Sequence, residues 1–289
     1  MEYTIAMNNV YLGSCSWKYP SWEGLVYSSR SPGNFLEEYS RKYRTVEIDQ
    51  WFWSLGKASY GLPNRNLVAE YDAATPSYFK FTIKCPNTIT SSLAYRGGTQ
   101  PNQWFLHPEV FTQFFDRIEP LVPKLGLLMF QFEYLNKDKM DSRKQFLDRL
   151  DTFFSALPKG LPYAVELRNP RWIDSSWFSY LQGQHVAPVL LQGYWMDDIT
   201  ATLQRYGDQL GDRACIRLHG DDRKGIEQAT GEDWSRIVTS RDDELSLLAP
   251  LIAKVAKEGT TLYINVNNHY EGSSPLTISK LEKLLDTQE

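Results

Sequence analysis

The stretch Tyr263-Ile264-Asn265-Val266-Asn267-Asn268-His269-Tyr270-Glu271-Gly272 begins as an apolar strand and ends in amides and an imidazole. Successive side chains of a strand point to opposite faces, so Ile264 and Val266 share one face while Asn265 and Asn267 share the other. Burying an amide without a hydrogen-bond partner costs about 1–3 kcal/mol. These Asn side chains therefore predict partners on the same face, supplied by other strands or by a ligand.

Eight short runs rich in β-branched and aromatic residues recur along the chain, and seven of them are followed by a candidate helix. This alternation predicts an α/β fold, a single TIM-type barrel domain over residues 1–289. The expected strands are Tyr11–Trp17, Thr45–Gln50, Tyr78–Cys85, Leu125–Phe132, Tyr163–Asn169, Val186–Gln192, Ala214–Gly220 and Thr261–His269.

Apolar residues at helical spacing predict the helices that should cover the barrel. These stripes lie within residues 35–43, 110–118, 146–154 and 245–255. Asp174 is the expected N-cap of a further helix, and Ser274-Pro275 should begin the last one. Only the sixth crossover, Gly193–Arg213, shows no clear pattern.

Three long segments follow strands and are expected to be loops at the carboxyl face of the barrel, where barrel enzymes place their active sites. They are Lys18–Gly33, Pro86–His107 and Asp221–Asp233. Long loops are uncommon unless they have a function, so these segments favour a site at that face.

The bulk properties narrow the classes of protein and partner. The 289 residues carry a net charge of −4, which argues against nucleic acid as a partner because that binding uses clustered Lys and Arg. No apolar run approaches the ~20 residues of a membrane helix, so no membrane partner is expected. Met1-Glu2-Tyr3 opens without the regions of a secretion signal, which predicts a cytoplasmic protein. The oligomeric state is left open.

Three cysteines lie in or at the end of apolar runs, where reduced Cys behaves as a small hydrophobic residue. They are Cys15, Cys85 and Cys215. Cys15 is the one candidate nucleophile, but no neighbouring His or acid in the sequence marks it as activated.

Most of the expected strands place polar side chains on one face near the carboxyl end, and these faces should meet inside the barrel mouth. The inward-facing groups are expected to be Ser14 and Ser16, Glu47 and Asp49, Thr82 and Lys84, Gln131, Glu166 and Arg168, Arg217 and His219, and Asn265 and Asn267. The balance of charges is neutral to positive and suits a small anionic ligand.

Glu47 and Glu166 are the candidates for general acid and base, with Lys84 or His219 as the other group that transfers a proton. Gly272–Pro275 places free backbone N–H groups at a helix start, which could hold an anion; an ordinary helix cap is the alternative. The residues expected to bind substrate are Ser14, Trp17, Asp49, Gln131, Arg168, Arg217, Asn265, Asn267, Asn268, Ser273 and Ser274.

Two other interpretations of the polar mouth stay open. The groups could form a structural network in which Glu166 pairs with Arg168 or Arg217. A divalent metal could also bind there, since suitable ligand types occur at Glu47, Asp49, Glu166, His219 and His269. Because no short ligand spacing such as HxxxH or CxxC is present, a metal is not favoured and the cofactor is unknown.

Aromatic residues near the expected mouth could stack on a sugar or a base, although aromatics more often fill cores. They are Trp17, Tyr19, Trp22, Trp51, Phe52, Trp53 and Trp104.

With these residues assembled, the chain resembles the YecE-like family, also called domain of unknown function 72, from about Leu12 to Leu285. The resemblance is carried by the order of several segments and implies a TIM-type barrel with a polar mouth and no established activity. Those segments are Ser14–Tyr19 with Trp22, Thr45–Asp49, Phe79–Lys84, Gly126–Gln131, Val165–Arg168, Ile216–Gly220 and Asn267-Asn268. The chain differs from the usual family residues at Cys15, Asp49, Trp53 and Asn169, among others.

The favoured hypothesis is a barrel enzyme that performs acid/base chemistry, as a hydrolase, isomerase or lyase, on a small anionic, phosphorylated or polyhydroxylated substrate. The first alternative is a nucleotide or nucleic-acid binding module that uses the aromatics and local Lys and Arg. The second is a barrel that senses a ligand without catalysis.

Overall fold

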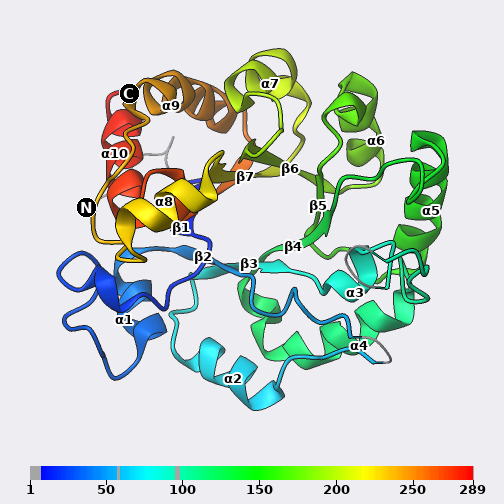
Figure 1. Ribbon diagram of the computed structural model, residues 1–289, viewed down its shortest axis with the longest axis horizontal. Coiled ribbons are helices and arrows are strands. Elements are labelled where there is room, and N and C mark those ends of the chain that lie inside the picture. The colour runs from blue at the N-terminus through cyan, green and yellow to red at the C-terminus, as the bar shows by residue number, and fades with distance from the viewer. Residues whose placement is uncertain (1–7, 57–58, 95–97, 289) are drawn as a thin grey trace.

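All eight expected strands form in the computed structural model, and they pair in parallel in the order β1-β8-β7-β6-β5-β4-β3-β2 around a barrel surrounded by helices (Figure 1). The structure describes residues 8–56, 59–94 and 98–288; the opening Met1-Glu2-Tyr3 lies outside them. The strands are β1 Val10–Ser14, β2 Thr45–Ile48, β3 Lys80–Lys84, β4 Leu125–Phe132, β5 Tyr163–Leu167, β6 Ala187–Gly193, β7 Arg213–Gly220 and β8 Thr261–Val266. The predicted TIM-type barrel is therefore confirmed.

The predicted helices also form, and the expected cap at Asp174 is present because its carboxylate accepts the backbone N–H of Trp177. The α-helices are α1 Phe35–Lys42, α2 Arg65–Ala73, α3 Asn87–Thr90, α4 Pro108–Ile118, α5 Arg143–Ala156, α6 Ser175–Gly183, α7 Ile199–Tyr206, α8 Arg223–Thr230, α9 Asp242–Lys257 and α10 Ser274–Asp286. Short 3₁₀ helices are η2 Pro20–Trp22, η3 Glu119–Lys124, η4 Pro170–Trp172, η5 Gly207–Gln209 and η6 Asn268–Tyr270. Within the described ranges, no helix is long and apolar enough to cross a membrane.

Several boundaries differ from the expectations. The first strand ends at Ser14, not Trp17, and the eighth ends at Val266, where Asn268–Tyr270 turn into η6. The sixth crossover contains α7, and α8 occupies most of the segment Asp221–Asp233 that was expected to be a loop. No apolar stripe was predicted for α2. Its buried side chains are few and include Val68 and Tyr71.

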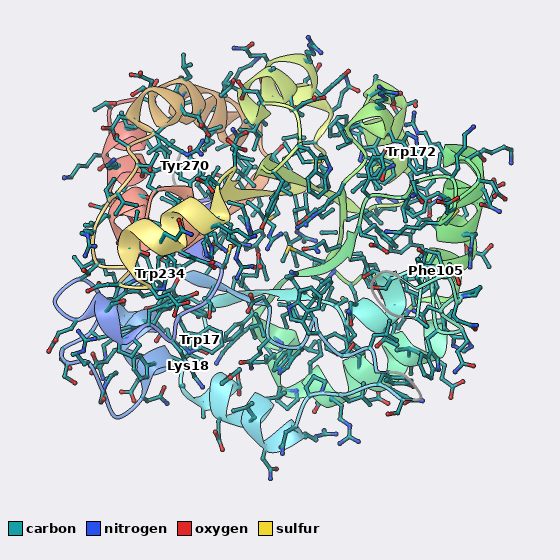
Figure 2. All side chains as sticks on the ribbon, viewed as in Figure 1. Trp17, Lys18, Phe105, Trp172, Trp234 and Tyr270 are labelled. Carbon is teal, nitrogen blue, oxygen red and sulfur yellow. The ribbon has the colours of Figure 1, made fainter. Side chains whose placement is uncertain are left out.

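The interior of the barrel has an apolar base and a charged upper part. The base is filled by Tyr11, Leu127, Met129, Ala164, Ala187, Val189, Cys215 and Tyr263. Nearer the carboxyl ends of the strands, inward-facing Glu47, Glu166 and Arg217 are each at most 2% exposed. Side chains fill the centre of the barrel in Figure 2. The remaining apolar core lies between the strands and the surrounding helices.

One side chain spans the gap between β1 and β2, the only neighbouring strands of the described barrel that share no ladder hydrogen bonds. The Tyr39 hydroxyl, on α1, accepts hydrogen bonds from the backbone N–H and hydroxyl of Ser14 and donates to the carbonyl of Thr45, over distances of 2.9, 2.9 and 3.1 Å. Gly13 permits the close approach of the two strands, because a Cβ there would lie 2.1 Å from the Thr45 carbonyl oxygen.

We expect Tyr39→Phe to lower the free energy of unfolding by about 1–3 kcal/mol, because it removes the bridge and leaves buried partners unsatisfied. Tyr43→Phe is the matched control: Tyr43 is equally buried on the next turn of the chain, but its hydroxyl has no hydrogen-bond partner among the described residues. Urea unfolding should show little or no loss for the control. Equal losses in the two variants would contradict the bridging role.

Candidate functional site

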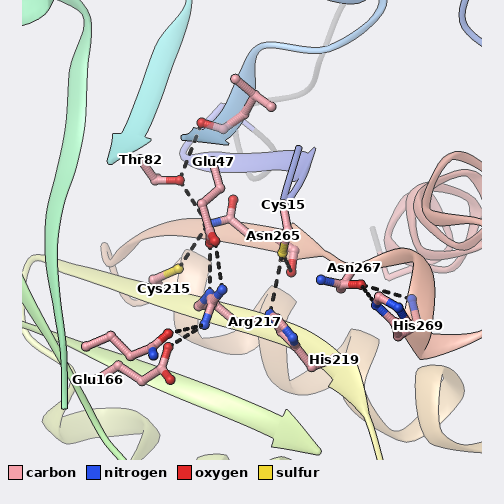
Figure 3. A network of polar contacts seen from close by, with 12 residues as sticks. Cys15, Glu47, Thr82, Glu166, Cys215, Arg217, His219, Asn265, Asn267 and His269 are labelled. Atoms are coloured by element: carbon pink, nitrogen blue, oxygen red, sulfur yellow. Dashed lines mark hydrogen bonds and ion pairs between the residues drawn. The ribbon is translucent and has the colours of Figure 1, made fainter. Parts of the chain in front are cut away.

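The site is organised around Arg217, whose guanidinium lies between two inward-facing glutamates (Figure 3). Nε and Nη2 donate to the two carboxylate oxygens of Glu47 at 2.8 and 2.7 Å, and Nη1 donates to Glu166 at 2.5 Å. Nη1 also lies 3.4 Å from the side-chain oxygen of Gln131. The planar fork of Arg217 thus joins β7 to β2, β4 and β5 across the barrel.

Glu166 also accepts a hydrogen bond from Arg168 Nε at 2.7 Å, so each of its oxygens meets one arginine. Burial alone would raise the pKa of Glu166, but Arg217 and Arg168 outweigh this effect and hold it at about 2. The structure therefore contains the ion-pair network that was the structural alternative to a catalytic role for these residues. Glu166 is ionised, and Glu47 binds the other side of the Arg217 fork.

Asn265 closes the lower side of the network. Its amide nitrogen donates to Glu47 at 3.1 Å and to the hydroxyl of Thr82 at 2.9 Å, and it lies 3.5 Å from the sulfur of Cys215. Asn265 is fully buried, and other strands supply the partners of its amide nitrogen. Its side-chain oxygen has no hydrogen-bond partner among the described residues.

Asp49 and Lys84 are the ionisable side chains at the mouth that this network leaves out. The register of β2 and β3 pairs Glu47 with Thr82 and Ile48 with Ile83, so the next step places Asp49 beside Lys84 with both side chains directed inward. Neither side chain has an ion pair or hydrogen bond to another residue within the described ranges. The ammonium group of Lys84 lies 4.0 Å from the centre of the Phe52 ring.

Both groups titrate near neutral pH. Burial and the neighbouring Glu47 raise the pKa of Asp49 to about 6. Burial and the charge of Arg217 lower the pKa of Lys84 to about 8, against the opposing effect of the nearby carboxylates. Groups with such pKa values can both gain and lose protons under ordinary conditions.

Two contacts hold the guanidinium of Arg168, one with Glu166 and one with the ring of Tyr194. Its Nε binds Glu166, and its guanidinium lies 5.2 Å from the centre of the Tyr194 ring. No other residue of the described chain forms a hydrogen bond with Nη1 or Nη2 of Arg168, and the side chain keeps 17% of its exposure. A terminal guanidinium edge in this position can bind an oxyanion in a bidentate manner.

His219 lies beside Cys15, with Nε2 3.6 Å from the sulfur. Burial together with Arg217, Arg168 and Lys84 holds the pKa of His219 well below its usual range, which favours the neutral imidazole. Burial and Glu47 raise the pKa of the Cys15 thiol. The pair therefore consists of a neutral imidazole and a thiol and is not an activated nucleophile. All three cysteines are buried and free, as predicted.

The first strand presents the opposite face from the one expected. Ser14 points toward α1, where its hydroxyl binds Tyr39, and Cys15 points into the barrel. Gly13 and Tyr11 are the inward-facing positions before Cys15, and neither offers the polar alternation that fixed the face of the other strands. Ser14 accordingly does not line the mouth.

The aromatic residues mostly fill the core. Trp17, 3% exposed, meets Tyr71 of α2 edge to face at 5.1 Å and does not face the mouth (Figure 2). Trp22, Trp51 and Phe52 are also buried. Trp53 is the exception at 80% exposed.

The region after β8 is likewise occupied by protein. The Asn268 side-chain oxygen accepts the backbone N–H and hydroxyl of Ser274, each at 2.9 Å, and thereby caps α10. Asn268, Ser273 and Ser274 are at most 3% exposed. Ser273, the N-cap residue of α10, makes no side-chain capping hydrogen bond, and its hydroxyl and the amide nitrogen of Asn268 have no hydrogen-bond partner among the described residues. The anion site at this helix start stays a prediction. Asn267 is partly exposed and accepts the backbone N–H of His269 at 3.0 Å.

The metal ligands considered from the sequence do not converge. His269 lies away from the Arg217 network and bonds to Glu227 of α8 at 3.0 Å. Across the described ranges, no group of three His, Cys, Asp or Glu side chains is arranged to hold a metal ion.

Two residues that sequence reasoning missed belong to the mouth. Tyr194 follows β6 with a positive φ of 57°, and Trp195, half exposed, donates from its indole nitrogen to the carbonyl of Arg168 at 3.4 Å. Gly193, whose own φ is 124°, was the available signal, because a glycine at a strand end marks a sharp turn. Because the sixth crossover showed no clear pattern in the sequence, neither Tyr194 nor Trp195 was predicted to belong to the site.

The fold and the site define the class of protein: a (β/α)8 barrel whose strand ends carry a buried ion-pair network beside two unpaired titratable groups. The family described as "Protein of unknown function DUF72" matches residues 11–289. The chain belongs to this family.

Relatives and solved structures agree with this assignment. The chain is 28% identical over 163 residues to the UPF0759 protein YecE of Escherichia coli K12, which covers 56% of this chain and 50% of that protein. The match thus spans about half the length of the curated relative. A DUF72 family protein from Enterococcus faecalis V583 superposes with a TM-score of 0.72 at 20% identity, covering 96% and 95% of the two chains. One from Thermotoga maritima MSB8 gives 0.70 at 22% identity, covering 96% and 99%.

Arg217→Lys should lower the free energy of unfolding by roughly 2–4 kcal/mol, because lysine cannot reproduce the fork that binds Glu47 and Glu166. The control is Arg213→Lys, at the exposed amino end of the same strand, which should change stability by less than about 0.5 kcal/mol. Urea unfolding measures both. If Arg217→Lys lowered the free energy of unfolding no more than the control does, the Arg217 network would not be a main source of stability.

Asp49→Asn should be more stable than the wild type above about pH 6, by about 1–3 kcal/mol. The raised pKa means that the native state of the wild type holds a proton that the unfolded chain has already lost, so its stability falls between about pH 4 and 6. The difference between the two proteins should be small near pH 3.5, grow through this window and then stay constant. Asp208→Asn, on an exposed turn, should show no such trend.

Proposed function

We propose that the carboxyl end of the barrel is the active site of an enzyme that transfers protons on a small anionic substrate. The observation that carries this proposal is the pair Asp49 and Lys84, inward-facing neighbours whose pKa values of about 6 and 8 lie on either side of neutrality. Keeping a buried lysine and a partly buried aspartate without ion-pair partners costs stability, which is more easily explained by a function than by packing.

Asp49 is the proton carrier in this scheme. Its pKa of about 6 makes the carboxylate available above that pH while keeping it basic enough to remove a proton. Glu47 and Glu166, the acid and base suggested by the sequence, hold Arg217 and Arg168 instead. Both glutamates have their oxygens occupied by arginine.

Arg168 is assigned to the anionic group of the substrate. Glu166 and Tyr194 hold its guanidinium, the whole side chain is 17% exposed, and its terminal nitrogens have no hydrogen-bond partner among the described residues. A phosphate or carboxylate fits this edge, and Gln131 and neutral His219 can bind hydroxyl groups nearby. This arrangement supports phosphorylated or polyhydroxylated substrates for an isomerase, lyase or hydrolase.

The experiment is a substrate screen in D₂O. Sugar phosphates and small hydroxy and keto acids are incubated with the protein, and proton NMR follows both new products and the exchange of carbon-bound hydrogen for deuterium. Exchange reports proton abstraction even when no product accumulates. We expect at least one compound to react, at a rate that rises with pH through about 6 as Asp49 loses its proton.

Asp49→Asn should lower the rate by about 10²–10⁴-fold, the usual range for a general base, whereas Asp208→Asn should leave it unchanged. Undiminished turnover in Asp49→Asn would overturn the assignment. Binding of a compound with neither turnover nor exchange would instead identify a ligand-sensing barrel.

A further inference from the structure

Two lysines of the described chain are buried, and they differ in their surroundings. Lys124, 7% exposed, donates to the backbone carbonyls of Asp72 and Thr75 at 2.6 and 2.8 Å and pairs with the Asp72 carboxylate at 2.7 Å. Lys84, 8% exposed, has no such acceptor within the described ranges. Burial of an amine without acceptors disfavours its ammonium form, and the pKa of Lys84 is lowered accordingly.

The surroundings of Lys84 suit a nucleophilic amine. Its amine nitrogen lies over the Phe52 ring, 4.0 Å from the ring centre, and within the described ranges it has no hydrogen-bond acceptor. The side chain projects from the carboxyl end of β3 into the barrel mouth, which is where a bound substrate would lie. Asp49, opposite in the β2–β3 register and without a partner among the described residues, can exchange protons with a group attached to that nitrogen.

We propose that Lys84 forms an imine with the carbonyl carbon of a small anionic aldehyde or ketone, with Asp49 moving the protons and Arg168 binding the anionic group. This inference rests on the proposed function and narrows its substrate class to carbonyl compounds. Desolvated lysines in apolar surroundings are the ones that perform Schiff-base chemistry.

The step balances without an oxidant or reductant. The neutral amine of Lys84 forms a bond to the carbonyl carbon as the C=O π bond breaks, and transfer of a proton from nitrogen to oxygen gives a carbinolamine. Protonated Asp49 then donates a proton to the hydroxyl group. Water leaves as the nitrogen lone pair forms the C=N bond, and the Asp49 carboxylate takes back the proton remaining on nitrogen. The sum is amine plus carbonyl giving imine plus water.

Arg168 explains why the carbonyl compound should be anionic. Its guanidinium shares Glu166 with Arg217, while Arg217 is one of the charges that act on Lys84. Arg168 and Lys84 both lie close enough to Glu166 to lower its pKa, so a small molecule that binds Arg168 through an anionic group is expected to reach Lys84 through its carbonyl group. A neutral carbonyl compound lacks this second attachment.

The experiment is reductive trapping with sodium cyanoborohydride, which converts an imine to a stable secondary amine. The full chain is incubated at pH 8 with dihydroxyacetone phosphate or with uncharged glyceraldehyde, and peptide mass mapping locates the adduct. At pH 8 about half of Lys84 is neutral, given its pKa of about 8, whereas an ordinary lysine is neutral in fewer than about 1% of molecules. We expect Lys84 to be labelled at least about tenfold faster than Lys80, at the other end of the same strand.

The variants separate the roles. Lys84→Met should lose the adduct while circular dichroism shows an unchanged fold, and Lys80→Met should keep the Lys84 adduct. Arg168→Met should slow labelling by dihydroxyacetone phosphate about tenfold or more relative to labelling by glyceraldehyde, since only the first probe carries a charge to bind. Asp49→Asn should slow labelling by both probes without moving it to another lysine.

Labelling of Lys84 no faster than of Lys80 with both probes would overturn the proposal. If exchange in D₂O persists in that case, Asp49 still transfers protons and only the covalent step is lost. If Lys84 is trapped selectively but no compound shows turnover or exchange, the imine stands and the proton-transfer function fails. If Arg168→Met slowed labelling by both probes equally, the proposed substrate would not need an anionic group.

Discussion

The ion pairs of Arg217 are the interaction on which the upper half of this barrel depends. Burying three charges within the barrel is costly, because each loses its hydration, and only good geometry and complete hydrogen bonding repay that cost. Here the fork of one arginine meets two carboxylates from β2 and β5, and Arg168 completes the coordination of Glu166. The result is a rigid charged layer over the apolar base, and it fixes the positions of the strands that carry the mouth residues.

That layer also determines the proton affinities above it. The negative charge of Glu47 makes ionisation of Asp49 harder, while the positive charge of Arg217 makes protonation of Lys84 and His219 harder. A neutral layer, such as the apolar interior common in barrels, would shift these groups by burial alone. Structure and electrostatics are thus coupled: the groups that hold the barrel together are the ones that tune the groups left unpaired.

Alternation along each strand was enough to predict the barrel and most of its inward-facing residues, because the side-chain period of two is imposed by the backbone. It placed Glu47, Lys84, Glu166, Arg217 and Asn265 correctly inside. It failed at β1, where Gly13 and Tyr11 provide no polar signal and a shift of one residue exchanges Ser14 for Cys15. It also could not distinguish bound from unpaired carboxylates, because Arg217 reaches strands that are not its neighbours. Turns such as Gly193–Trp195 depend on backbone conformation, which the side-chain pattern does not record.

The order of strand pairing bears on how this chain folds during synthesis. β1 pairs with β8, so Val10 lies beside Leu262, whereas the described residues of β1 and β2 share no ladder hydrogen bonds and are bridged by the Tyr39 hydroxyl. β1 therefore gains its ladder of hydrogen bonds only after β8 has been synthesised. Such contacts between distant parts of a chain form slowly. Until then its edge is unprotected, and Cys15 has not yet reached His219. The mouth is completed only when the two ends of the barrel meet.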